Sequence, residues 1–132
     1  MYTISKEPWG VSMAFKGDIS GPEAAAWLVD IGKARKEYIG RPWHALVDMR
    51  EMAVVGPEAQ ESFIKGQVAA REDGMVRACV ILSSAVATLQ AIRRAKESGI
   101  YKYERYIDGR QRADWQAAAM AWLEQGLDPD KP

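Results

Sequence analysis

The stretch WHALVDMREMAVVGPEAQESFIKGQVA, residues 43–69, decides the fold, because it reads as a buried strand, a loop and a helix. Its first six residues are mainly apolar and alternate with a period of two, which predicts a central strand covered by helices. Pro57 and Glu58 then predict a helix start. The fixed φ of proline is harmless in a first turn, and a carboxylate there faces the positive end of the peptide dipoles.

The predicted loop between this strand and this helix is the first candidate for a binding site. In open α/β sheets, ligands bind where the carboxyl end of a strand is followed by a helix. The turn after the next predicted strand, over residues 83–84, is expected to lie beside this loop. The candidate partner- or ligand-binding residues are Arg50, Met52, Val54, Val55, Glu58, Ser83 and Ser84.

Strands and helices alternate along the rest of the chain. We expect a hairpin of residues 2–5 and 11–15, strands over residues 43–48, 77–82 and 103–107, and helices that begin after Ser20, at Pro57, after Ser83-Ser84 and after residues 108–111. Ser20 and Glu23 match a capping box. The order ββαβαβαβα predicts an α/β mixed sheet with flanking helices, parallel except at the hairpin edge. The expected organisation is one domain over residues 1–126 and a disordered tail over residues 127–132.

Three segments together carry a family resemblance. They are LVDMREMAVVGPEA (residues 46–59), VILSS (residues 80–84) and RYIDGRQRADWQAAAMAWL (residues 105–123). In pattern and order they are similar to the SpoIIAA-like, or STAS-like, family of small bacterial proteins. The resemblance implies a single-domain mixed sheet with helices packed about it.

The resemblance also bears on regulation. In the anti-sigma-factor antagonists of this family, a serine at the start of the helix after the central strand is phosphorylated, and the charge switches binding to a partner kinase. Pro57 and Glu58 stand near that position, and Ser62 is expected inside the helix. We therefore expect a module that lacks the phosphoacceptor serine. We interpret Glu58 as a first-turn acid, with imitation of the phosphorylated state as the alternative.

Two functions remain open. The first is a non-enzymatic regulatory or binding module that contacts a protein partner through the loop of residues 50–58. The alternative is a binder of an apolar small molecule or of the membrane surface through residues 52–55, supported by five tryptophans and by a lipid association suggested for related proteins. In a third interpretation, Val54 and Val55 close the end of the core, and Trp27, Trp43 and Trp122 are core side chains. Homodimer formation also stays open.

Charge and composition exclude several classes of partner. Eighteen basic and eighteen acidic residues cancel among 132, so no long-range field attracts nucleic acid. The apolar runs are too short to span a bilayer, and the first residues lack the pattern of a secretory signal. We expect a cytoplasmic protein whose single domain buries about two-thirds of its unfolded surface.

No residue pattern indicates catalysis. Cys79 and His44 each stand alone, and neither can complete a disulfide or a metal cluster of its own kind. Asp48 and Ser83 resemble parts of a two-component receiver, but the additional acids and the lysine of that site are missing. Phosphate-binding, dinucleotide-binding and hydrolase motifs are also missing. We therefore expect no enzyme activity, no cofactor and no metal.

Overall fold

Five strands and four α-helices make up the part of the chain described by the computed structural model, residues 1–131. They are β1 (Tyr2–Glu7), β2 (Gly10–Ile19), α1 (Gly21–Arg35), β3 (Trp43–Val55), α2 (Pro57–Glu72), β4 (Met75–Leu82), α3 (Ala85–Ser98), β5 (Glu104–Asp108) and α4 (Trp115–Gln125). Short 3-10 turns, Lys36–Tyr38 and Ile100–Lys102, follow α1 and α3. The predicted order ββαβαβαβα is confirmed.

The strands form one sheet in the order β1-β2-β3-β4-β5. β1 pairs antiparallel with β2, and the remaining neighbours pair in parallel. The predicted hairpin edge on a parallel sheet is therefore confirmed. Gly10 closes this hairpin with a φ of 150°, and a Cβ there would stand 1.9 Å from the carbonyl oxygen of His44. Only glycine allows this close approach.

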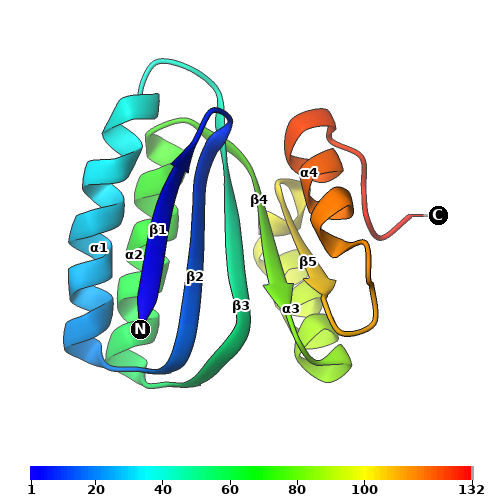
Figure 1. The fold of residues 1–132 in the computed structure, drawn as a ribbon, viewed down its shortest axis with the longest axis horizontal. Helices are drawn as coiled ribbons and strands as arrows, with labels where there is room; N and C mark the ends of the chain where they lie inside the picture. Colours follow the sequence, from blue (N-terminus) through cyan, green and yellow to red (C-terminus); the bar gives the residue numbers. More distant parts are fainter. Residues whose placement is uncertain (132) are drawn as a thin grey trace.

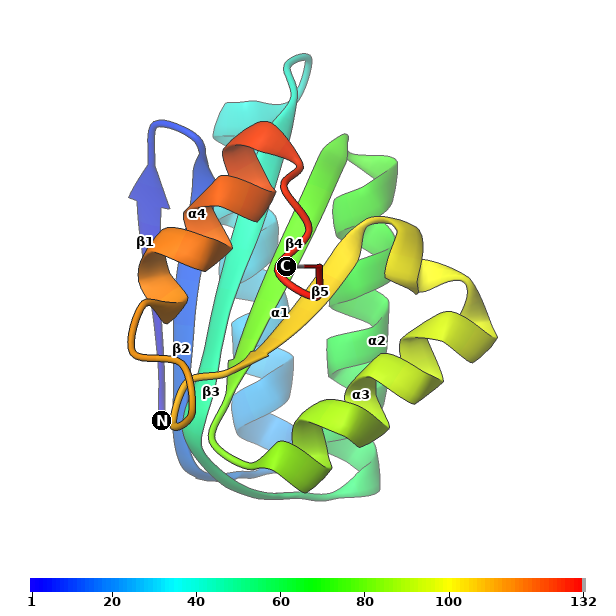
Figure 2. The same ribbon diagram turned by 90° about the vertical axis from the view of Figure 1, so that its right-hand side faces the viewer.

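Helices cover both faces of the sheet. α1 and α2 lie side by side on one face, and α4 lies on the other (Figure 1). The strands alternate accordingly, since Val47 and Val80 pack on the α2 and α3 side whereas Leu46 and Cys79 pack under α4. α3 packs on Val80 and Tyr106, so it shares the face of α2 but lies at the β4–β5 end (Figure 2).

Aromatic rings fill the space between α1, α2 and the sheet. The ring of Phe63 lies 5.0 Å from that of Phe15 and 5.2 Å from that of Trp27, edge-on in both pairs. Aromatic pairs favour this geometry, because the positive ring edge meets the negative ring face. These contacts hold α2 against α1 and β2.

Small residues let α4 lie close to the opposite face. Ala118 and Ala119 are buried against the sheet, together with Leu123. The indole Nε1 of Trp122 donates a hydrogen bond to the carbonyl oxygen of Ala78 at 2.9 Å. A large ring is thus buried with its polar atom satisfied.

β3 is longer than the sequence predicted. It continues to Val55, so residues 50–55 lie in a strand where the sequence predicted a loop. Two register shifts against β2 interrupt the ladder in this part. As a result Met49, Met52 and Val55 all pack on the same core, although strict alternation would separate Met49 from Met52. The period of two is broken in this part of the sequence, so alternation did not predict that the strand continues to Val55.

The predicted starts of three helices are confirmed. The Oγ of Ser20 accepts the N–H of Glu23 at 3.1 Å, and the Oγ of Ser84 accepts the N–H of Ala87 at 3.2 Å. Pro57 is the first residue of α2. The carboxylate of Glu23 pairs with the chain's N-terminal amine at 2.7 Å.

α4 begins later than predicted. Asp108 was expected to cap it, but its carboxylate accepts the N–H of Arg110 at 3.0 Å and closes a local turn. The helix starts at Trp115, and Asp114 precedes it without a capping hydrogen bond from its side chain. The short acidic turn is an Asx turn, which competes with a helix start for the same side chain.

Polar contacts connect residues 127–131, the described part of the predicted tail over residues 127–132, to the rest of the chain. Residues 127–131 lie within the described part of the chain, and Asp128 pairs with Arg105 of β5 at 2.9 Å. Tyr101 donates a hydrogen bond to Asp130, and Arg112 donates one to the carbonyl oxygen of Pro129 at 3.0 Å. A polar segment can be held by such long-range polar contacts, which composition does not reveal. Pro132 lies outside the described residues.

Candidate functional site

A cavity of about 400 Å³ opens between α2 and α3, over β3, β4 and β5. α2 packs against α1, whereas α3 packs against β5 (Figure 2), and side chains of both helices line the cavity. Sites for small molecules typically have volumes of about 300–1,000 Å³. The cavity is therefore large enough for a ligand.

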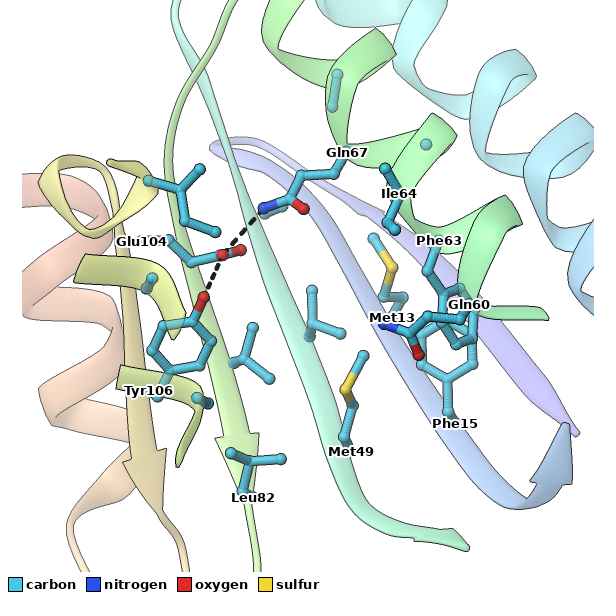
Figure 3. A pocket seen from close by; sticks show the side chains of 18 of the residues that line it. Met13, Phe15, Met49, Gln60, Phe63, Ile64, Gln67, Leu82, Glu104 and Tyr106 are labelled. Atoms are coloured by element: carbon cyan, nitrogen blue, oxygen red, sulfur yellow. Dashed lines mark hydrogen bonds between the residues drawn. The ribbon is translucent and has the colours of Figure 1, made fainter. Parts of the chain in front are cut away.

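Most of the lining is apolar. Figure 3 shows Met13 and Met49 extending into the space from β2 and β3, and Leu82 lines it from β4. The apolar lining includes Met13, Phe15, Val47, Met49, Met52, Phe63, Val80 and Leu82. A lining of this kind favours a ligand that is largely apolar, because apolar side chains make up most of the surface it would contact.

Small side chains on α3 keep the cavity open. Ala87, Ala91 and Ala95 follow one another at a spacing of four residues, which places them on one face of the helix. All three line the cavity. Larger residues on this face would fill the space between α3 and the floor.

One wall carries a connected polar cluster. Glu104 of β5 is 7% exposed, and its Oε2 accepts hydrogen bonds from the Oη of Tyr106 at 2.5 Å and from the Nε2 of Gln67 at 3.0 Å (Figure 3). Burial raises the pKa of Glu104, while the two hydrogen bonds act in the opposite direction. Burial and the neighbouring Glu104 raise the pKa of Tyr106. The cluster joins α2 to β5 across the cavity.

Mixed polar and apolar side chains form the edge of the cavity. Gln60 and Ile64 line it from α2, and Gln90 and Arg94 line it from α3. Ile64 is 54% exposed. The edge thus offers apolar contacts next to charged and amide groups.

Two of the candidate residues from the sequence lie together on the α4 side of the sheet. The guanidinium of Arg50 pairs with Asp48 at 2.8 Å and lies 4.4 Å from the ring centre of Trp115. The Oγ of Ser83 donates to the carbonyl oxygen of Arg50 at 2.9 Å. Ser84 instead caps α3. These contacts join β3, β4 and α4.

The other candidate residues lie elsewhere. Met52 lines the cavity, and Val55 packs into the core beside it. Val54, which is 70% exposed, and Glu58 border a shallow hollow where α1 and α2 begin. The seven candidates are therefore divided, and Met52 is the one that lines the cavity between α2 and α3.

Sequence reasoning missed the polar cluster. Glu104 and Tyr106 are two residues apart in a predicted strand, so they share one face of the sheet. An acidic residue within an aromatic strand was the one sequence feature that could have indicated this cluster. Gln67 has the same helical spacing as the apolar residues Phe63 and Val68, so its position alone does not indicate a polar contact. No local pattern relates Gln67 to Glu104, because they meet only through the packing of α2 against the sheet.

His44 and Cys79 lie away from the cavity. Burial, together with Arg77, lowers the pKa of His44. Burial raises the pKa of the Cys79 thiol to about 12, and this side chain packs under α4. Within residues 1–131, no group of three or more His, Cys, Asp or Glu side chains is arranged to hold a metal. No helix in that part of the chain has the length and apolarity needed to cross a membrane.

Comparison with known proteins supports the fold. No protein-family model matches the chain, and neither does any curated protein. The structure is similar to that of an uncharacterised protein of the DUF3478 family from Shewanella loihica PV-4, which is described as having a SpoIIAA-like fold. The identity is 14%, the match covers 87% of this chain and 91% of that chain, and the TM-score is 0.57. The predicted SpoIIAA-like fold is thereby confirmed.

Proposed function

We propose that this protein binds an apolar small molecule in the cavity between α2 and α3, and that it acts by binding rather than by catalysis. The observation that carries this proposal is a cavity of about 400 Å³ with an apolar floor and a single buried carboxyl cluster on one wall, as far as residues 1–131 describe it. In small-molecule sites, a small number of such polar groups fixes the orientation of the ligand, while apolar contacts supply most of the affinity.

The size of the cavity supports an occupant. Protein interiors are close-packed, and spaces much larger than one water molecule are few, because each lost contact weakens the core. Filling this space would restore contacts to Met49, Val80 and Leu82 on the floor. Removal of apolar surface from water contributes about 25 cal/mol per Å².

The position of the cavity supports a regulatory consequence of binding. A ligand there would touch α2 and α3 together, and these helices otherwise pack on different neighbours, α1 and β5. Binding would therefore link the two ends of the sheet. Such a ligand, at a free concentration [L], would stabilise the folded state by RT ln(1 + [L]/Kd).

The proposal can be tested with Nile red, a neutral dye whose emission rises in apolar surroundings. Ala87→Phe and Ala91→Phe each place a ring in the cavity and should weaken dye binding. Ala117→Phe, on the exposed side of α4, is the matched control and should bind like the wild type. Equal dye binding by all four proteins would contradict a site between α2 and α3.

A second candidate function is regulation through a protein partner at the hollow bordered by Val54 and Glu58. It is favoured by the 70% exposure of Val54, an apolar side chain beside the first turns of α1 and α2. Val54→Asp and Glu58→Arg should then abolish capture of that partner from cell extract. An unchanged set of captured proteins would count against this candidate.

A further inference from the structure

Glu104 is a buried acid whose two oxygens are used unequally. Tyr106 and Gln67 both donate to its Oε2, and within residues 1–131 no hydrogen bond reaches its Oε1. No cation within that part of the chain forms a salt bridge with this carboxyl group. Glu104 lines the cavity, and Figure 3 shows its side chain reaching from β5 into the space toward α2.

The Oε1 atom of Glu104 can be reached from the cavity, because it is not among the fully buried side-chain atoms without a partner within residues 1–131. Buried acids in proteins are usually paired with a cation or saturated with hydrogen bonds, since burial removes them from water. Here two donors are arranged around one oxygen, and the other oxygen keeps its lone pairs free. A hydrogen-bond donor in the cavity would be able to bond to this oxygen, and a positively charged donor complements the carboxylate best.

We propose that the occupant of the cavity is an amphiphile with a protonated amine at its polar end, which donates to Oε1 of Glu104 while its apolar part lies over β3 and β4. This inference rests on the proposed function and specifies its ligand. The amine supplies the counter-charge that the chain itself does not supply, and the apolar part fills the remaining space.

Arg94 carries the opposite charge to Glu104 and would favour a ligand with an anionic polar end. These two are the charged residues among those described that line the cavity. Arg94 is exposed, whereas Glu104 is 7% exposed. Charge interactions in water are weak and are strengthened by burial, so Glu104 discriminates between polar ends more strongly than Arg94 does.

The test is calorimetric titration with three ligands that share a twelve-carbon chain: dodecylamine and dodecanoate, each below its micelle concentration, and dodecanol below its solubility limit. The wild type should bind dodecylamine at least tenfold more tightly than dodecanoate. Glu104→Gln should remove this preference and still bind dodecanol. Glu124→Gln, an exposed acid on α4, is the matched control and should keep the preference.

The outcomes separate this inference from the proposed function. A wild type that prefers dodecanoate, with binding lost in Arg94→Met, would overturn the amine assignment and leave the cavity as the binding site. Equal affinity of the wild type for all three ligands would also overturn it, even if Glu104→Gln failed to fold. If none of the three ligands binds, the Nile red measurement separates the two proposals. Binding of Nile red that Ala91→Phe blocks would refute only the amine ligand. Absence of Nile red binding would refute the proposed function as well.

Discussion

The indole ring of Trp27 in α1 lies directly against the backbone of Gly66 in α2. A Cβ at residue 66 would stand 2.5 Å from Cη2 of Trp27. Trp27 is 6% exposed and held by Phe15 and Phe63, so it has little freedom to move away. The contact fixes how closely α1 and α2 approach.

We therefore expect Gly66→Ala to destabilise the protein. Overpacking costs about 1–3 kcal/mol, which outweighs the gain of up to about 1 kcal/mol from replacing glycine within a helix. Gly32→Ala in α1 is the matched control, because the atom nearest its new Cβ, on the side chain of Arg35, is 3.8 Å away, an ordinary van der Waals distance. Urea unfolding should show opposite signs for the two variants. If both variants were more stable than the wild type, the contact between Trp27 and Gly66 would not be rigid.

The pair Arg105–Asp128 should hold the end of the chain in place. Their side chains are 9% and 15% exposed, so Asp128→Ala leaves a nearly buried guanidinium without its partner. The expected loss is about 3 kcal/mol in the free energy of unfolding. Asp114→Ala removes an exposed ion pair with Arg112 and should cost at most about 1 kcal/mol. Equal losses of stability in Asp128→Ala and Asp114→Ala would contradict a special role of the Arg105–Asp128 pair in holding the end of the chain.

The same pair predicts a dependence on pH. The hydrogen bond from Arg105 lowers the pKa of Asp128 below its ordinary value of 3.8. The unfolded state therefore binds this proton more tightly, so the contribution to stability is complete above about pH 4 and is lost as pH falls through the lowered native pKa. Acid titration of stability should be less steep in Asp128→Asn than in the wild type.

Glu104 should show the opposite sign. Burial raises its native pKa above the ordinary 4.5, so the folded state loses stability relative to the unfolded state as pH rises through that window. Glu104→Gln keeps an acceptor for Tyr106 and Gln67 and should be more stable than the wild type at neutral pH. The difference should vanish in acid. Glu97→Gln, exposed on α3, is the control and should change little. A less stable Glu104→Gln would show that the carboxylate is needed for folding.

Cys79 should be unreactive while the protein is folded. Its side chain is 0% exposed, and burial raises the pKa of its thiol to about 12, so little reactive thiolate forms at neutral pH. A thiol reagent should label one cysteine quickly in denaturant and slowly in the native protein. Fast labelling of the native protein would mean that α4 lifts from the sheet readily.

Local sequence signals predicted the architecture and missed the site for a physical reason. Ser20, Pro57 and Ser84 act within one helical turn, so the starts of their helices could be predicted. The strand through Met52 could not, because the register shifts against β2 depend on two strands together. The Gln67–Glu104 contact spans 37 positions and exists only after α2 packs on the sheet.

The thioethers of Met13, Met49 and Met52 give the cavity floor an adaptable shape. Methionine has an unbranched, polarisable side chain that adjusts to irregular partners. We expect the floor to accept straight, branched or ring-containing hydrocarbons alike, so that selectivity resides in the polar wall. Oxidation of these sulfur atoms would give sulfoxides, which make the floor polar. We therefore expect peroxide treatment to weaken the proposed binding of an apolar ligand.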